Sequence, residues 1–201
     1  MFLAFTGAIS QGILWGVMAL GLYITFRILD IADLTVDGSL ALGGCVTAVL
    51  ITEYGTDPWI ALVVALLAGA VAGAVTGVLH TIFDIPAILA GILTQISLWS
   101  INLRIMGKSN IPLLQSANIF GDIAAATGLP QSVVSMLIGL VFAIALIAGL
   151  YWFFGTEIGA ALRATGNNEQ MVRALGVHTR MTKLIALVLS NGLVGLAGGL
   201  I

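Results

Sequence analysis

The sequence is built from long apolar segments separated by short polar ones. A helix needs about 17–25 mostly apolar residues to cross a bilayer. Four segments reach that length, residues 2–26, 58–79, 86–102 and 132–154, and a further span begins near Leu184. This pattern predicts an all-α fold, a polytopic bundle of transmembrane helices.

A sixth apolar segment, residues 40–52, is too short to cross a bilayer by itself. It follows the polar hinge "DIADLTVDGS", residues 30–39. The segment reaches spanning length only if part of the hinge also lies at membrane depth. We therefore expect a broken or re-entrant second helix.

Arg104 and Lys108 close the fourth segment. The longer polar stretch that follows, with Pro112, Gly121, Gly128 and Pro130, is the best candidate for an extramembrane loop. The sequence stops at Ile201 inside an apolar helical pattern, without a cap, a basic anchor or a polar tail. We treat residues 1–201 as a single transmembrane domain. The pattern at its end predicts a truncation at the carboxyl terminus.

The composition agrees with a membrane protein. The chain is 60% hydrophobic and 8% charged, whereas a soluble domain carries about 25% charged residues. A net charge of −2 without a long basic tract argues against nucleic acid as a partner. His80 and His178 have no other potential ligand at a metal-site spacing, and no serine or carboxylate pair has a catalytic arrangement. We expect neither enzyme activity nor a metal site.

Glycines recur at four-residue spacing within the spans. The sets are Gly12 with Gly16, Gly69 with Gly73 and Gly77, and Gly195 with Gly199. This spacing places the glycines on one helix face, where the missing side chains let two backbones approach closely. The sets predict a packed bundle.

Four of the seven basic residues lie in one segment, "GTEIGAALRATGNNEQMVRALGVHTRMTK", residues 155–183. Thr156 can cap a helix that Gly166 ends in the left-handed conformation. Asn167 can cap a second helix, with Gln170 in the capping-box position, and Gly176 closes it. The segment predicts a helix, turn, helix unit at the cytoplasmic surface.

Each of these two predicted helices has an apolar side. The first side carries Ile158, Ala161, Leu162 and Thr165, the second carries Met171, Val172 and Leu175, and Arg163, Arg173, Arg180 and Lys183 surround them. Two interpretations stay open. The cations can simply anchor the neighbouring spans at the membrane surface, or the apolar face can dock into a groove on a soluble protein.

The basic residues also predict an orientation. If residues 155–183 are cytoplasmic, alternation of the spans places Arg27 on the same side and Arg104 with Lys108 on the opposite side. Five cations then lie inside and two outside, which agrees with the excess of Lys and Arg in cytoplasmic loops. The amino terminus is then outside.

The hinge holds three of the nine acidic residues, Asp30, Asp33 and Asp37. A carboxylate at the bilayer centre costs about 3 kcal/mol, so each must lie at the interface, be neutralised or face a wet cavity. We interpret Asp30 and Asp33 as interfacial, paired with Arg27. Asp37, with Thr35 and Ser39, opens the short second helix, where an interrupted helix can present backbone groups to a solute.

Gln95, Trp99 and Asn102 follow one another at i, i+4 and i+7 and therefore share a helix face. An amide exposed to lipid is poorly satisfied, so this face should turn toward protein or water. Hydrogen-bonded helix packing is one explanation. The other is that the face lines a solute pathway, in which case Trp99 offers a flat surface to an apolar or aromatic solute.

Two stretches carry a resemblance to a known family. "GTEIGAALRATGNNEQMVRALGV", followed by "LVLSNGLVGLAGGL", resembles the cytoplasmic coupling region of permease subunits of ABC importers in the branched-chain amino acid and ribose permease superfamily. The hinge "ILDIADLTVDGSLALGG" resembles the polar break before the second helix of these proteins, particularly in the branch that works with lipoprotein-type binding proteins. The similarity runs through nearly the whole chain in segment order.

The resemblance implies that a cytoplasmic ATP-binding subunit docks on a coupling region, residues 155–181. It also implies that two permease chains pair as a homodimer in the bacterial inner membrane, and that an extracytoplasmic binding protein delivers the solute. ATP and Mg would lie on the partner ATPase, and this chain would hold no cofactor. Residues expected at the ATPase contact are Arg163, Ala164, Thr165, Gly166, Asn167, Asn168 and Arg173. Residues 164–168 would form the turn between the coupling helices.

We therefore expect a permease subunit of an ATP-driven importer for a small solute such as an amino acid. The residues expected along its pathway are Thr35, Asp37, Ser39, Gln95, Trp99 and Asn102. The alternative is a secondary transporter or channel that works without an ATPase. An ion-coupled carrier usually places ionisable residues within its spans, and residues 58–83 and 123–156 contain no Asp, Glu, Lys or Arg. The "GKS" at residues 107–109 lacks the earlier glycine and the strand of a phosphate-binding loop.

Overall fold

A computed structural model describes residues 2–108, 111, 128 and 130–201, which form helices and no strand. The helices are α1 (Phe2–Tyr23), the π-helical turn η1 (Ile24–Ile28), α2 (Val36–Thr52), α3 (Pro58–Thr81), α4 (Ala87–Met106), α6 (Gln131–Gly155), α7 (Glu157–Asn167), α8 (Glu169–Ala174) and α9 (Thr179–Leu200). Five membrane-spanning candidates lie among them, with α2 as a shorter apolar helix. The all-α, polytopic prediction is confirmed.

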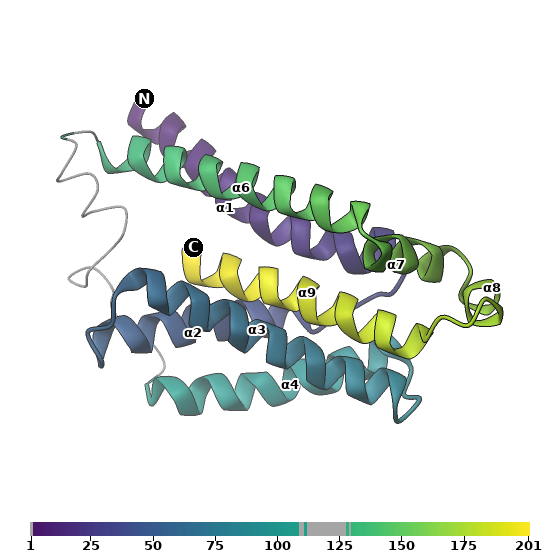
Figure 1. Cartoon of the computed structure of the whole chain (residues 1–201). Helices are drawn as coiled ribbons and strands as arrows, with labels where there is room; N and C mark the ends of the chain where they lie inside the picture. The colour runs from purple at the N-terminus through teal and green to yellow at the C-terminus, as the bar shows by residue number, and fades with distance from the viewer. Residues whose placement is uncertain (1, 109–110, 112–127, 129) are drawn as a thin grey trace.

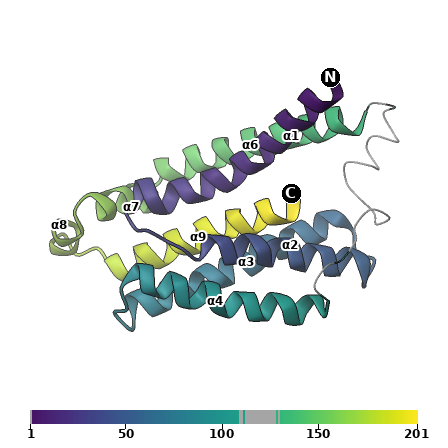
Figure 2. The same cartoon turned by 180° about the vertical axis from the view of Figure 1, so that it is seen from behind.

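Helix α9 occupies the middle of the bundle. It lies between the α1–α6 pair on one side and α2 with α3 on the other, while α4 covers the outer side of α2 and α3 (Figures 1 and 2). Of the most apolar window of α9, 61% is buried, against 11% for α6. The short helices α7 and α8 connect α6 to α9 at the end of the bundle opposite both termini (Figure 1).

Glycines bring α2 and α3 into backbone contact with α9. A methyl group at Gly195 would lie 2.6 Å from the Ala65 carbonyl oxygen and 2.9 Å from Gly69 Cα, and one at Gly43 would overlap the Gly195 carbonyl. The predicted glycine packing is therefore confirmed for the α3 and α9 sets. Gly12 and Gly16 have nothing within 4 Å of such a methyl group, so that pair does not mediate packing among the described residues.

Replacing Gly195 by leucine should strongly destabilise the bundle. The side chain would have to displace backbone atoms of α3, so we expect a loss at or beyond the upper end of the about 1–3 kcal/mol typical of overpacking. Gly149→Leu is the matched control, because Gly149 on α6 has open space around it. Thermal unfolding of the detergent-solubilised protein compares the two variants, and equal melting temperatures would contradict the close packing.

The second helix is broken, and it is not re-entrant. After η1, residues 29–35 are non-helical and run back along the bundle to the start of α2 (Figure 1). We call residues 29–35 the unwound segment. Helix α2 then runs parallel to α9, because Gly43 lies against Gly195 and Thr47 lies against Gly199. It therefore ends at the far side of the bundle, where α3 begins.

Most of the polar stretch between Arg104 and Pro130 lies outside the described residues, so the prediction of an extramembrane loop there stays a prediction. Ser109 of the "GKS" tripeptide lies outside them as well.

Candidate functional site

A buried polar network joins the unwound segment to α9. Asp33 Oδ1 accepts a hydrogen bond from the Thr35 N–H at 2.9 Å, and Asp33 Oδ2 accepts one from Asn191 Nδ2 at 2.7 Å. Asn191 Oδ1 in turn accepts the Ser39 hydroxyl at 2.7 Å. Asp33 is 2% exposed, and Asn191 and Ser39 are fully buried. Both carboxyl oxygens of Asp33 thus have N–H donors inside the protein, as buried polar groups require.

One interpretation from the sequence needs correction here. Asp33 is not interfacial and bonds to Asn191 instead of Arg27, whose side chain is exposed. Thr35 and Ser39 are both fully buried, and their place along a solute pathway stays a prediction. The Thr35 hydroxyl is hydrogen-bonded at 2.8 Å to that of Thr76 on α3. Both residues therefore fasten the broken helix to its neighbours.

Asn191 was missed by the sequence analysis. The available signal was an amide and a serine in an otherwise apolar run, "LVLSNGLVGL". An uncharged polar residue within a span either packs by hydrogen bonding or lines a cavity, and the sequence alone does not name its partner.

Asp37 and Gln95 lie together on the outer surface of the bundle. Asp37 is exposed in the first turn of α2, and Gln95 Nε2 lies 3.5 Å from its Oδ2. Trp99, one turn further along α4, is 72% exposed. We call these three residues the α2–α4 face. Ser39, two residues after Asp37, bonds to Asn191 near the middle of α9, so the face lies at about half the depth of the bundle.

Asn102 does not belong to this face. The inward positions of α4 are Ala90, Gly91, Thr94, Leu98 and Asn102. Asn102 is 7% exposed, and its Oδ1 has no hydrogen-bond partner in the part of the chain that the structure describes. On a helix of 3.6 residues per turn, Asn102 lies only about 60° around the axis from Trp99. Asn102 is nevertheless buried with Thr94 and Leu98 while Trp99 is exposed, so the edge of the buried side of α4 passes between Trp99 and Asn102. Gln95 is half-buried at the boundary.

Residues 155–181, called the end unit below, form the predicted pair of short helices, with a shifted boundary. The Thr156 hydroxyl caps α7 by accepting the Gly159 N–H at 3.4 Å, as expected. Helix α7 then continues to Asn167, and Asn168 caps α8 by accepting the Met171 N–H at 3.0 Å. The assignments of Gly166 as the left-handed end and of Asn167 as the cap are wrong.

Gly166 has a different role, which lies in packing. A side chain at this position would overlap the Ile28 carbonyl group and lie 3.0 Å from Leu29 Cα. Glycine is therefore needed where α7 crosses the start of the unwound segment. Gly176 follows the end of α8 in the left-handed conformation, at φ 85°, and the prediction that it closes this helix is confirmed.

The apolar sides of α7 and α8 are only partly used inside the molecule. Leu162 and Val172 are buried, and Leu162 packs with Ile24 and Leu29. Of the residues expected at the ATPase contact, Arg163, Asn167, Asn168 and Arg173 are exposed, Ala164 and Gly166 are half-buried, and Thr165 is buried. The apolar side chains left on the surface are Ile158, Met171 and Leu175, exposed by 51%, 52% and 74%.

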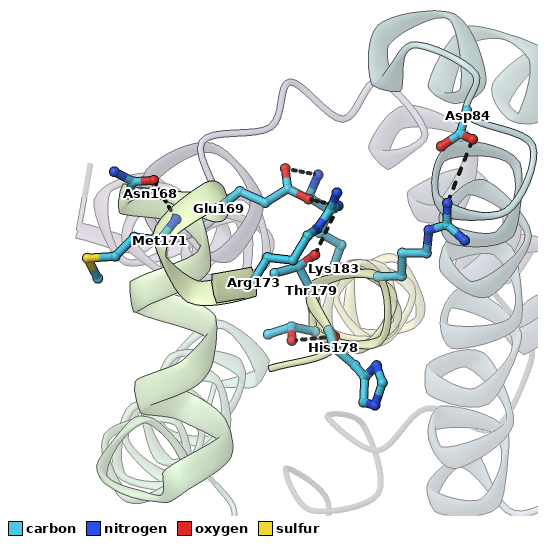
Figure 3. A network of polar contacts seen from close by, with 10 residues as sticks. Asp84, Asn168, Glu169, Met171, Arg173, His178, Thr179 and Lys183 are labelled. Carbon is cyan, nitrogen blue, oxygen red and sulfur yellow. Dashed lines mark hydrogen bonds and ion pairs between the residues drawn. The ribbon is translucent and has the colours of Figure 1, made fainter. Parts of the chain in front are cut away.

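An ionic cluster fastens α8 to the start of α9. Glu169 lies between Lys183 Nζ at 2.6 Å and Arg173 Nη2 at 3.1 Å (Figure 3). The hydrogen bond from Lys183 is the main reason that the pKa of the Glu169 carboxyl is lowered from its ordinary value. The Met171 side chain points away from this cluster (Figure 3).

We expect Glu169→Gln to reduce stability at pH 7 by about 0.5–1 kcal/mol, because both charges retain some contact with solvent. A carboxyl whose pKa is lowered on folding stabilises above its unfolded pKa, and this contribution is lost as the pH falls through the folded pKa. The difference from wild type should therefore shrink below about pH 4.3. Thermal unfolding between pH 7 and pH 3 measures the difference in stability between wild type and Glu169→Gln, and Glu53→Gln at the other end of the bundle is the control. A difference that is independent of pH would contradict the role of this ion pair.

Within the described ranges, no group of three or more His, Cys, Asp and Glu residues could hold a metal ion. The fold and the site together define a polytopic α-helical membrane protein with an interrupted second span, polar side chains exposed at half depth, and a helical unit fixed to one end. The chain belongs to the family described as "Branched-chain amino acid transport system / permease component", which matches residues 4–201. It is a multi-pass membrane protein, and the bacterial inner membrane fits its transport relatives.

Curated relatives agree with this family. The chain is 40% identical over 192 residues to a "Tyrosine transport system permease protein" of Clostridioides difficile, covering 95% of this chain and 61% of that protein. It is 32% identical to an uncharacterized protein of Rickettsia prowazekii, covering 96% and 65%. A probable branched-chain amino acid transport permease protein of Methanocaldococcus jannaschii is 26% identical, covering 97% and 64%. The chain thus spans less than two thirds of these relatives. No solved structure matches it.

Proposed function

We propose that this chain is the membrane-spanning subunit of an ATP-driven ABC importer, and that a separate cytoplasmic ATPase binds the end unit. The observation that carries this proposal is the attachment of the end unit. It is continuous with α6 and α9, it is fastened to α9 through Glu169 and Lys183, and its Gly166 lies on the backbone of Ile28. A unit held at these points can pass a partner's movement to several helices at once.

The ATPase would contact the surface that the end unit leaves open. Met171 and Leu175 are one helical turn apart and exposed, and Arg163 and Arg173 lie near them in the chain. Apolar anchors surrounded by charge are typical of protein interfaces. ATP and Mg would be bound by that partner, and this chain would need no cofactor.

The charge distribution supports a cytoplasmic end unit. Arg27, Arg163, Arg173, Arg180 and Lys183 belong to segments at the end of the bundle that carries α7 and α8, while Arg104 and Lys108 belong to the opposite end. This excess agrees with the positive-inside rule. The amino terminus would then be extracytoplasmic, and a substrate-binding protein would deliver the solute on that side.

The solute pathway would run along the α2–α4 face. An exposed carboxylate at half the depth of a bilayer cannot face lipid without a large penalty, so this surface must meet water or a second permease chain. A homodimer that pairs around this face would enclose Asp37, Gln95 and Trp99 in a central pathway. Thr35, Ser39 and Asn102 would support the face from inside the protein.

The chemistry of this face fits an amino acid. Asp37 can hold an ammonium group, and the first turn of α2 presents backbone N–H groups suited to a carboxylate. Trp99 offers a stacking surface for an apolar or aromatic side chain, and the Clostridioides difficile relative is named a tyrosine transport permease. We therefore propose an amino acid, with aromatic ones as the first to test.

A secondary transporter remains the second candidate, for one specific reason. Asp33 is buried and Asp37 is exposed within the depth of the bundle, and carboxylates inside a membrane are the usual sites of ion or proton coupling. The hydrogen bonds that Asp33 receives from Thr35 and Asn191 give it a structural explanation, which favours the importer.

The deciding experiment uses the full-length permease in liposomes, with and without a candidate ATPase subunit and with a candidate solute-binding protein. Uptake of labelled tyrosine, phenylalanine and leucine is measured with ATP and with proton or sodium gradients. The importer proposal expects uptake only with the ATPase and ATP. Uptake driven by an ion gradient without ATPase would overturn it in favour of the secondary transporter.

A further inference from the structure

A single amide on α9 holds the chain on both sides of Asp37. Asn191 Nδ2 donates to Asp33, four residues before Asp37, and Asn191 Oδ1 accepts from Ser39, two residues after it. The second Nδ2 hydrogen is directed to the Leu187 carbonyl oxygen at 3.1 Å. The amide therefore uses its donors and its acceptor, and its orientation is fixed by all three bonds.

We propose that Asn191 and Asp33 are positioning residues that couple the movement of α9 to Asp37. The inference rests on the proposed function, because it assigns the route by which ATPase movement reaches the solute face. The bond of 2.7 Å between Asp33 and Asn191 ties α9 to a segment that has left the helical conformation.

The other end of the route lies at the end unit. Lys183, two turns before Asn191 on α9, binds Glu169 of α8, and Gly166 of α7 lies on the backbone where the unwound segment begins. A displaced end unit would therefore move α9 through Lys183 and the start of the unwound segment through Ile28. Both displacements converge on the stretch that ends at Asp37.

The surroundings leave the unwound segment room to move. A cavity of about 530 Å³ lies beside it, lined by residues 29–32, by His80 and Pro86 near the α3–α4 connection, and by Gly166 and Glu169 of the end unit. Beyond Asp33 the segment is tightly held, since a methyl group at Gly91 of α4 would lie 2.8 Å from the Leu34 nitrogen. The segment is thus held at Leu29 by Gly166 and at Leu34 by Gly91, and the open space lies beside the residues between them.

Two serine variants test the proposal with a matched control. Ser39 and Ser190 are both fully buried, and each hydroxyl donates one hydrogen bond of 2.7 Å, Ser39 to Asn191 and Ser190 to the Gly21 carbonyl oxygen on α1. Ser39→Ala removes the hydrogen bond between Asn191 and α2. Ser190→Ala removes a hydrogen bond of equal length between α9 and α1, which does not involve the unwound segment. The readout is the number of solute molecules transported per ATP hydrolysed by the full complex in liposomes.

We expect Ser39→Ala to lower this ratio several-fold while ATPase binding and basal hydrolysis are kept, and Ser190→Ala to leave the ratio unchanged. Asn191→Asp places a carboxylate against Asp33 and should lower the ratio by about tenfold or more. The exchange Asp33→Asn with Asn191→Asp again places an amide donor against a carboxylate and should recover most of the ratio. A merely structural role would instead lower melting temperature and transport in parallel in each single variant, and the exchange would restore both together.

The outcomes separate the inference from the function on which it rests. If the wild-type complex shows no ATP-dependent uptake, the importer function and the positioning role are both overturned. If wild type is coupled but Ser39→Ala keeps the wild-type ratio, or if Ser190→Ala lowers it equally, only the positioning role is overturned. If Asn191→Asp does not fold, the serine pair still decides the question.

Discussion

Replacing Leu175 by glutamate is expected to weaken binding of the ATPase by about 30-fold or more. Leu175 is 74% exposed, which makes it the most exposed of the large apolar side chains of the end unit. If Leu175 anchors the ATPase, the variant loses an apolar contact and places the glutamate charge in the interface. Together these changes should reduce the binding free energy by about 2 kcal/mol or more, as the loss of a central interface residue does. The change leaves the helix core intact, because the buried residue of α8 is Val172.

Gln170→Glu is the matched control for this variant. Gln170 is exposed on the same helix, and the substitution adds the same negative charge without removing an apolar side chain. The affinity for the purified ATPase is measured for the wild-type permease and for both variants in detergent solution. Equal affinities for wild type and Leu175→Glu would show that the ATPase binds elsewhere on the permease.

Local signals in the sequence were sufficient for the spans and for the first cap of the end unit. Pro58 follows Asp57, whose carboxylate accepts the Trp59 N–H at 3.0 Å, and this arrangement starts α3 where the pattern predicted. Thr156 starts α7 in the same manner. Such caps depend on residues within one helical turn, so the sequence contains all the information needed to place them.

Contacts between distant residues decided the features that the sequence analysis placed wrongly. Asn167 and Asn168 are equally good caps, and α7 continues past Gly166 because it packs on Ile28, far away in the chain. Asp33 is buried because Asn191, 158 positions later, supplies a donor. Neither contact leaves a periodic pattern in the sequence.

The inward and outward sides of α4 could not be separated for a physical reason. In a soluble helix, the side facing water is polar and therefore visible in the sequence. In a membrane, lipid and protein interior are both apolar, so an apolar residue indicates neither side. Trp99 and Asn102 were therefore assigned to one face, although Trp99 lies outside and Asn102 lies inside.

The second large effect concerns Asp37 itself. Asp37→Asn keeps the size of the side chain and its contact with Gln95, but removes the negative charge. If Asp37 binds the ammonium group of an amino acid, the loss of this charged hydrogen bond should lower uptake efficiency by about tenfold or more. Binding of the ATPase should stay unchanged, because Asp37 lies at half depth, far from the end unit. Uptake of labelled amino acid at several concentrations separates the effect on KM from that on the maximal rate.

Asp30→Asn is the control that makes this result specific. Asp30 is exposed near the end unit at φ 55°, a conformation that asparagine also tolerates, so the change should be neutral for folding. Both variants remove one carboxylate from the same short stretch of the chain, and they differ in depth. A raised KM for Asp37→Asn alone would assign the charge to solute binding. Equal effects of the two variants would instead mean that net charge near the hinge controls transport, and Asp37 would then have no direct contact with the solute.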